Sequence, residues 1–262
     1  VAFGWPATVA GLLVLFAASA LALRSGARPD PRVAVETALV FALAFLLLVA
    51  VRAVDPAVHA TAGEKFLDFS LLKALVRADR LPPLDPWFAG ERVRYYYGGH
   101  MLAAVLTELT GTAPRYAYNL SLAGFYGMLV TAAYGLAGAL ADRLPASRTT
   151  ASAFGALFVG VASNLATPVR ALYGVVPDGV VGALAGLVGA DPANWEGSLT
   201  APLSEFSYWG ASRVIPGTIN EFPLFAFLNG DLHAHMMSTP FTLLAATLAL
   251  SYFRTPEAAL WR

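Results

Sequence analysis

The sequence predicts an all-α fold, a polytopic transmembrane helix bundle of about five spans with two long external loops that carry interfacial helices. Three observations support this fold class. Of the 262 residues, 57% are hydrophobic and 13% are charged, whereas a soluble domain has about 25% charged residues. Several apolar runs reach the roughly 20 residues that cross a bilayer. The short segments between those runs are rich in arginine, as cytoplasmic loops of membrane proteins are.

The composition excludes several classes of function. The net charge is zero and no basic stripe is present, so we expect no nucleic-acid partner. The chain has no cysteine, which excludes disulfides, a thiolate nucleophile and cysteine-ligated zinc. It starts at Val1 inside an apolar run and ends at Arg262, so we expect a single membrane domain that is a piece of a longer chain. The lipid bilayer is its first expected partner.

Residues 1–54 are predicted to form two spans, at 3–23 and 33–54. The second run is nearly unbroken Ala, Leu, Val and Phe, and a short linker with Gly and Pro separates it from the first. Basic residues in short loops mark the cytoplasmic side of a membrane. The linker carries three of them, Arg24, Arg28 and Arg32.

Residues 55–114 are predicted to form the first external loop, with surface helices. The stretch 63–80 has an apolar stripe at helical spacing but is too charged to span, so it fits a helix lying at the interface. A Pro-rich stiff turn follows. Residues 101–110 are apolar but too few to cross. The stripe consists of Leu67, Leu71, Ala74, Leu75 and Ala78.

The rest of the chain is predicted to hold two spans in 115–172, a second external loop at 173–235 and a last span in 236–262. The apolar runs that predict these three spans cover residues 113–141, 149–172 and 236–253. If residues 101–110 stay at the surface, every short basic segment falls in the cytoplasm and both long loops lie outside. We therefore expect a multi-pass protein of the cell membrane with extracytoplasmic loops.

Glu64 and Asp68 are the first candidate site residues. Their spacing places both carboxylates one turn apart on a helix face. Such a pair could act as general base or bind a divalent metal. The alternative is the solvated face of a surface helix, with Lys65 and Lys73 as partners.

A second candidate segment, residues 92–100, holds two arginines, three consecutive tyrosines and a histidine. Three adjacent tyrosines cannot all face one way, so at least one phenol should differ in environment. Arginine suits phosphate, and the rings could stack on a sugar. The alternative is an aromatic belt at the membrane interface. The candidates are Arg94, Tyr95, Tyr96, Tyr97 and His100.

The third candidate segment is the end of the second loop, where His233 and His235 follow Asp231. With Glu221 they could ligate a metal or hydrogen-bond a phosphate or hydroxyl, because alternate residues of an extended segment face one side. The alternative is that Asp231 or Asn229 caps a helix. Upstream, Arg213 adds a cation to the same expected surface. Within the spans, Asn119 and Asn164 are predicted to form interhelical hydrogen bonds.

Taken together, the stretches GEKFLDF (63–69), PPLDPWFAG (82–90), YYYGGH (95–100), NEFP (220–223) and GDLHAH (230–235) resemble the YYY family of uncharacterised polytopic membrane proteins, the Chlor_Arch_YYY domain of unknown function. The resemblance covers about two thirds of the chain. Where the family pattern has His-Pro-His, this sequence has His-Ala-His, and Gly98 follows the tyrosines. Neither change removes a polar group.

That family is in turn similar to the GT-C glycosyltransferases, which place an acidic residue in the first external loop and use polyprenyl-phosphate sugars. This resemblance implies a glycosyltransferase acting at the outer face on a lipid-phosphate-linked sugar. Asp68 would be the general base and Glu64 would support it or a metal. The tyrosines would line the path of the sugar or lipid. The phosphate would be held by Arg94, Arg213, His233 and His235.

Two other classes of function stay open. A transporter or a solute- or partner-binding protein is one, although transporters place binding groups near the midplane and here the polar clusters lie in loops. A metal-dependent membrane hydrolase is the other, with a divalent metal as cofactor. The ligands of the hydrolase metal would come from Asp68, Asp231, His233 and His235. A metal in the transferase would instead be held by Glu64, Asp68, His233 and His235.

Overall fold

The described residues form an all-helical bundle, which confirms the predicted fold class. Among them no β-strand is present, and only two isolated bridges pair extended segments. The computed structural model describes residues 2–24, 30–59, 63–142, 147–162 and 218–254, together with positions 177, 179, 180, 183, 212 and 215.

Four helices in the described part of the chain are long and apolar enough to cross a membrane. They agree with the first, second, third and last predicted spans. The predicted span 149–172 is described only to residue 162, and the rest of it lies outside the described residues. Its described part is α6 (Arg148–Leu157), which continues into the π-helical turn η1 (Phe158–Ala162). The four candidate spans are α1 (Trp5–Arg24), α2 (Pro31–Val54), α5 (Pro114–Ala141) and α11 (Ala234–Arg254).

Local signals in the sequence explain where several of these helices begin. Asp30 precedes α2, and its side chain accepts a hydrogen bond from the Arg32 amide at 2.8 Å, as an N-cap residue does. Pro31 and Pro114 each occupy the first turn, where a proline is compatible with a helix because the first amides have no partner within it. These starts are therefore fixed locally.

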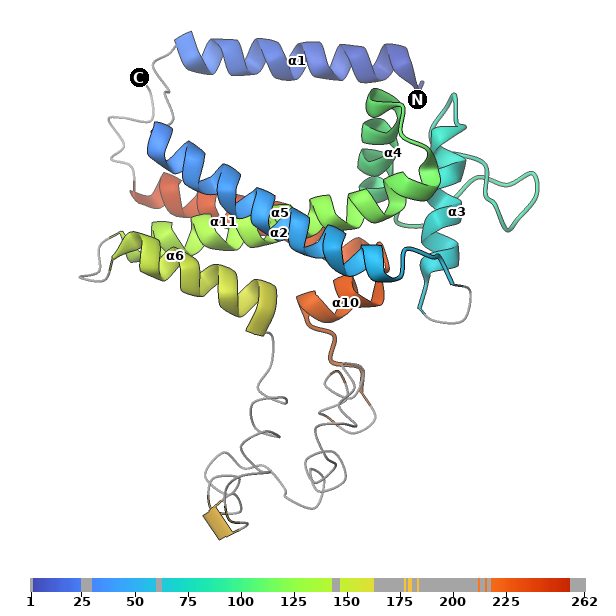
Figure 1. Cartoon of the computed structure of the whole chain (residues 1–262). Helices are drawn as coiled ribbons and strands as arrows, with labels where there is room; N and C mark the ends of the chain where they lie inside the picture. The colour runs from blue at the N-terminus through green and yellow to red at the C-terminus, as the bar shows by residue number, and fades with distance from the viewer. Residues whose placement is uncertain are drawn as a thin grey trace.

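The centre of the bundle is α5, which packs against α2, α6 and α11. In its most apolar stretch 56% of the residues are buried, against 6% in α1, which lies apart from the other spans in Figure 1. Small residues allow the close approach: a Cβ at Gly127 would lie 2.9 Å from the Phe41 ring of α2. As predicted, Asn119 forms interhelical contacts, accepting a hydrogen bond from Arg52 Nε at 2.8 Å. Asn164 lies outside the described residues.

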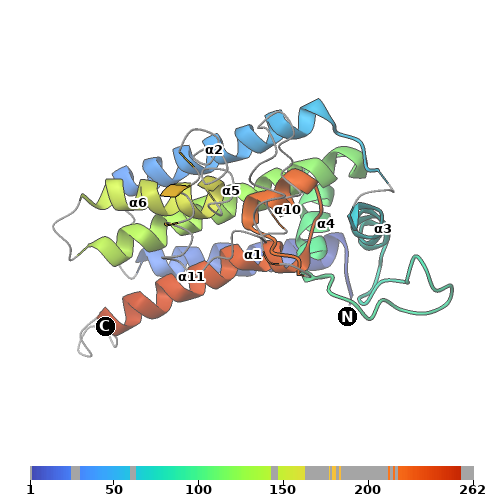
Figure 2. The ribbon, with the colours of Figure 1, turned by 90° about the horizontal axis from the view of Figure 1, so that it is seen from below.

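Three shorter helices gather at one end of the bundle, which we call the site end (Figures 1 and 2). They are α3 (Lys65–Val76), α4 (Gly98–Thr110) and α10 (Pro223–Asn229). The site end also holds the carboxyl end of α2 and the amino ends of α5 and α11. As predicted, α4 is no candidate span. The described parts of both long loops therefore meet at one end of the bundle.

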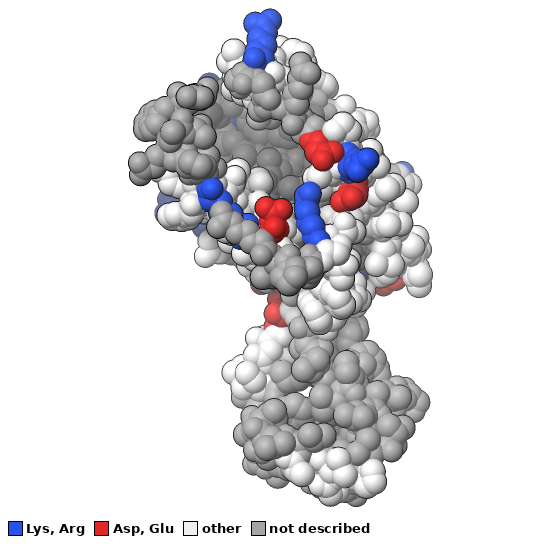
Figure 3. All heavy atoms as spheres, turned by 90° about the vertical axis from the view of Figure 1, so that its left-hand side faces the viewer, with Lys and Arg blue, Asp and Glu red and all other residues white. Residues whose placement is uncertain are grey.

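The other end of the bundle carries basic residues at helix ends (Figure 3). Arg24 is the last residue of α1, Arg32 lies in the first turn of α2, and Arg254 ends α11. The Arg254 guanidinium also donates to the Ala139 carbonyl of α5. The described basic residues at these helix ends and the described parts of the two long loops thus lie at opposite ends of the spans.

Candidate functional site

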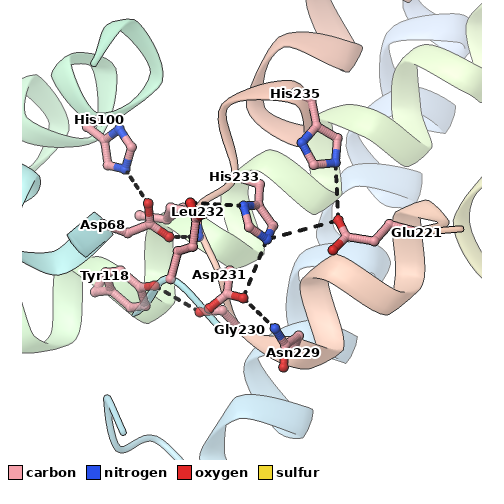
Figure 4. A network of polar contacts seen from close by, with 11 residues as sticks. Asp68, His100, Tyr118, Glu221, Asn229, Gly230, Asp231, Leu232, His233 and His235 are labelled. Atoms are coloured by element: carbon pink, nitrogen blue, oxygen red, sulfur yellow. Dashed lines mark hydrogen bonds and ion pairs between the residues drawn. The ribbon is translucent and has the colours of Figure 1, made fainter. Parts of the chain in front are cut away.

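Polar side chains from α3, α4, α5 and the segment 221–235 form one contact network at the site end (Figure 4). It has two parts. The inner network is fully buried and centres on Asp68, whereas the rim is partly exposed and centres on His233. The inner network consists of Asp68, His100, Tyr118, Gly230 and Leu232, and the rim of Glu64, Glu221, His233 and His235.

Asp68 holds three chain segments together from the buried face of α3. One of its oxygens lies 3.2 Å from His100 Nε2 on α4, and the other accepts the Leu232 amide at 2.9 Å. Asp68 is 2% exposed and His100 is 1% exposed. Both oxygens of the carboxylate thus have partners, and water does not reach it.

The face of α3 that is buried differs from the apolar stripe predicted. Leu71 and Leu75 are buried as expected, but Lys65 and Asp68 are buried with them, and Leu67 is only half-buried. The helix is turned because Asp68 finds polar partners in the segments packed against it. The spacing argument put Glu64 and Asp68 on one face, yet Glu64 keeps 49% of its side chain exposed.

The turn after α10 is fixed by Gly230, whose φ of 79° is left-handed. Its carbonyl accepts a hydrogen bond from the Tyr118 hydroxyl of α5 at 2.9 Å. A Cβ at this position would also lie 3.0 Å from the Arg52 guanidinium, which is 6% exposed. The turn therefore tolerates glycine best, and it orients the following residues toward α3.

Asp231 lies between the inner network and the rim. Its carboxylate accepts a hydrogen bond from the Asn229 amide and lies 3.5 Å from His233 Nε2. Burial raises the pKa of the Asp231 carboxyl to about 6, and a charge on His233 acts in the opposite direction. A Cβ at Gly63, which has a φ of 70°, would overlap this carboxylate. Asp231 is thus buried at low dielectric with basic groups nearby.

The rim brings together residues from both long loops around His233. Its Nδ1 lies 3.8 Å from a Glu64 oxygen, and its Nε2 lies 4.0 Å from a Glu221 oxygen. The same Glu221 oxygen lies 3.5 Å from His235 Nε2, and the two imidazoles stack with centroids 5.2 Å apart. Glu221 is 26% exposed and His235 is 55% exposed, so ligands can reach the rim.

Tyr95 extends the rim toward the tyrosine run. Burial raises the pKa of its phenol, and the carboxylates of Glu64 and Asp68 raise it further. Its hydroxyl therefore stays protonated near neutral pH. The three tyrosines do differ in environment, as predicted: Tyr96 is 70% exposed, and Tyr97 packs partly buried against the core.

One predicted phosphate ligand has no contact with the rim, and another lies outside the described residues. Arg94 is 89% exposed and lies 3.9 Å from Glu91, and Arg213 lies outside the described residues. Among the described residues, no group of three or more His, Asp or Glu side chains is arranged to hold a metal ion. The set considered for a metal is divided, because Asp68 contacts His100 while Glu64, His233 and His235 belong to the rim.

Sequence reasoning missed the residues that support the site from the spans. Arg52 was overlooked, although a charged residue inside an apolar span is itself a signal of function or specific pairing. Tyr118 gave no comparable signal, since a tyrosine in a span is ordinary. Asn229 was considered only as a cap, and its side-chain amide donates a hydrogen bond to the Asp231 carboxylate.

Comparison with known proteins gives a family. The family described as "Uncharacterized membrane protein (DUF2298)" matches residues 1–262. No curated protein and no solved structure matches the chain.

Proposed function

This chain belongs to the DUF2298 family of uncharacterised membrane proteins, and we propose that it is an integral membrane glycosyltransferase of the GT-C type, as the YYY-like motifs suggest. It would transfer a sugar from a polyprenyl-phosphate donor to a hydroxyl. One observation carries the proposal: carboxylates from both long loops, Glu64 and Glu221, meet His233 at an accessible rim. A reaction at this rim would occur beside the bilayer, where a lipid-linked donor is held.

In this proposal Glu64 is the general base. It is exposed enough to meet a substrate, and it lies near the Tyr95 phenol, a neutral hydrogen-bond donor. Asp68 suits another role, because both of its oxygens are already bonded and it is buried. It would position α3 against the segment that carries His233. A base must come within hydrogen-bond reach of the proton that it removes.

The transfer would proceed in one displacement. The acceptor hydroxyl loses its proton to Glu64, and its oxygen forms a bond to the anomeric carbon of the sugar. The bond from that carbon to the phosphate oxygen breaks, and polyprenyl phosphate leaves with the electron pair. The imidazole N–H groups of His233 and His235 would donate hydrogen bonds to this oxygen as its charge develops, as preorganised donors do. Glu221 would hold the two imidazoles in place.

The outer face is the proposed side of the membrane for this reaction. Arg24 at the end of α1, Arg32 in the first turn of α2 and Arg254 at the end of α11 lie opposite the site end. Because basic residues in short loops favour the cytoplasm, the rim would face outward.

The test is transfer from labelled polyprenyl-phosphate sugars to acceptors in membranes that contain the full chain. We expect Glu64→Gln to lower the transfer rate about 100-fold or more, the usual contribution of an acid–base group. Glu221→Gln should also lower the rate, because Glu221 holds the two imidazoles in place. Asp142→Asn is the matched control, because Asp142 is exposed at the far end of α5. It should transfer like the wild type.

Two results would contradict the proposal. Equal transfer by Glu64→Gln and the wild type would remove Glu64 as base. Absence of transfer by the wild type from hexose, aminohexose and pentose donors, together with solute uptake into proteoliposomes, would support a transporter instead.

A further inference from the structure

A second polar feature lies on the face of α3 turned away from Asp68. Ser70, Lys73, Ala74 and Arg77 share this face, because they are spaced three and four residues apart. Together with residues 78–80, 84–86 and Arg92 they line a cavity of about 590 Å³. We call it the basic pocket. None of the rim residues lines it.

The basic pocket has an excess of positive charge. It is lined by four cations and two carboxylates, which leaves a formal charge of +2. In the described part of the chain, none of these cations has a carboxylate within 4.0 Å. The cations are Lys73, Arg77, Arg80 and Arg92, and the carboxylates are Asp79 and Asp85.

One of the two carboxylates is already engaged by the backbone. Asp85 accepts hydrogen bonds from the amides of Trp87 and Phe88, at 2.8 and 3.1 Å, and so stabilises the turn. Arg92 pairs with Leu84 beside this turn, and it is held by a hydrogen bond from its Nη1 to the Pro82 carbonyl at 2.5 Å. The turn thus holds the Arg92 guanidinium at the pocket, and the Asp85 carboxylate is held within the turn by its Oδ1.

A second cavity, of about 540 Å³ and mainly apolar, adjoins the basic pocket, and Asp85 and Arg92 line both. Glu91 and Arg94 also line this second cavity. We call it the aromatic pocket. Trp87 is 58% exposed and Phe88 is 69% exposed, although large aromatic side chains are stable in contact with apolar groups. The apolar side chains that line it are Leu67, Leu71, Trp87, Phe88, Val93 and Tyr95.

We propose that the basic pocket binds a phosphoryl group, and that the aromatic pocket receives the apolar part of the molecule when a lipid carries that group. Guanidinium groups match phosphate oxygens in geometry and charge. A cationic pocket beside an apolar one, at the site end of a bundle of transmembrane helices, fits a lipid phosphate. None of the four cations of this site belongs to the rim, and Tyr95, which lines the aromatic pocket, also lies near Glu64. The proposal does not depend on the transfer proposed for the rim.

The test is calorimetric binding to the full chain, purified in a nonionic detergent. The probes are lysophosphatidic acid, a monoacylglycerol with the same acyl chain, and inorganic phosphate. We expect Arg77→Gln/Arg80→Gln to weaken binding of the phosphate-bearing probe about tenfold or more, since two charge-assisted contacts are lost. Arg115→Gln is the matched control, because this exposed arginine lies at the site end outside both pockets.

A second variant, expected to bind more tightly, keeps the proposal testable if the double variant does not fold. Asp79→Asn removes a repulsive carboxylate from the pocket and should tighten binding about twofold or more. Binding of lysophosphatidic acid but not of monoacylglycerol supports a lipid source, and binding of inorganic phosphate alone supports free phosphate. Binding of neither phosphate probe overturns the proposal. So does equal weakening by Arg115→Gln, or unchanged affinity in both pocket variants.

Discussion

The inner network and the rim use the same chemical groups in opposite ways. In the inner network Asp68 and His100 are sealed between helices, at 2% and 1% exposure, and both carboxylate oxygens are bonded. At the rim, Glu64 and His233 lie 3.8 Å apart, and Glu64 is half exposed. Glu64 is the N-cap of α3 and Asp68 lies four positions later, yet the first carboxylate can meet a ligand and the second fixes the architecture. Burial, more than residue type, assigns their roles.

The largest expected effect comes from breaking the inner network. Asp68→Ala should lower the free energy of unfolding by about 3–5 kcal/mol, because it leaves His100 and the Leu232 amide buried without their partner. Asp68→Asn keeps an acceptor oxygen and should cost less. Thermal and denaturant unfolding of the full chain in detergent would measure both. Equal unfolding midpoints for Asp68→Ala and the wild type would mean that the inner network does not stabilise the fold more than the rim does.

Asp231 lies between the inner network and the rim, and the pH dependence of protein stability reports on its ionisation. Its pKa is raised from 3.8 to about 6 by burial, so the folded state binds this proton more tightly than the unfolded state. Its contribution to stability is therefore complete below about pH 4 and is lost as pH rises through 6. Asp231→Asn, which cannot ionise, should gain stability relative to the wild type between pH 4 and 7. We would follow the difference in unfolding midpoint across that range.

The wild type supplies the reference for that experiment, because other groups titrate in both proteins. Only the difference between the two curves reports on Asp231. A difference that stays constant from pH 4 to 7 would mean that the carboxyl ionises in the folded protein as it does in the unfolded chain.

The spans and the surface helices could be predicted because apolar length and period are local properties. The start of α2 at Pro31 and the exclusion of α4 as a span needed no tertiary information. The rotation of α3 did need tertiary information, since Leu67 belongs to the predicted apolar stripe and is only half-buried, whereas Leu72 lies outside that stripe and is buried. The choice depends on partners for Asp68 that come from α4 and residue 232.

The residues of the site also divide into those that local sequence predicts and those that only tertiary packing brings together. Clusters close in sequence, such as Asp231 with His233, could be found by composition alone. The contacts of Arg52 with Asn119 and of Tyr118 with Gly230 join residues far apart in the chain. No sequence period encodes such pairs. They follow only from how α2, α5 and the segment after α10 pack together.

The smallest expected effect on stability is at the rim, and it sharpens the comparison most. Glu64→Gln should change the free energy of unfolding by less than about 0.5 kcal/mol, because the group is half exposed and its contact with His233 is screened by water. The same denaturant series used for Asp68 would measure it. If Glu64→Gln destabilised the protein as much as Asp68→Ala, Glu64 would belong with the architecture. A stable Glu64→Gln protein that has lost transfer would instead separate the two carboxylates of one helix by role.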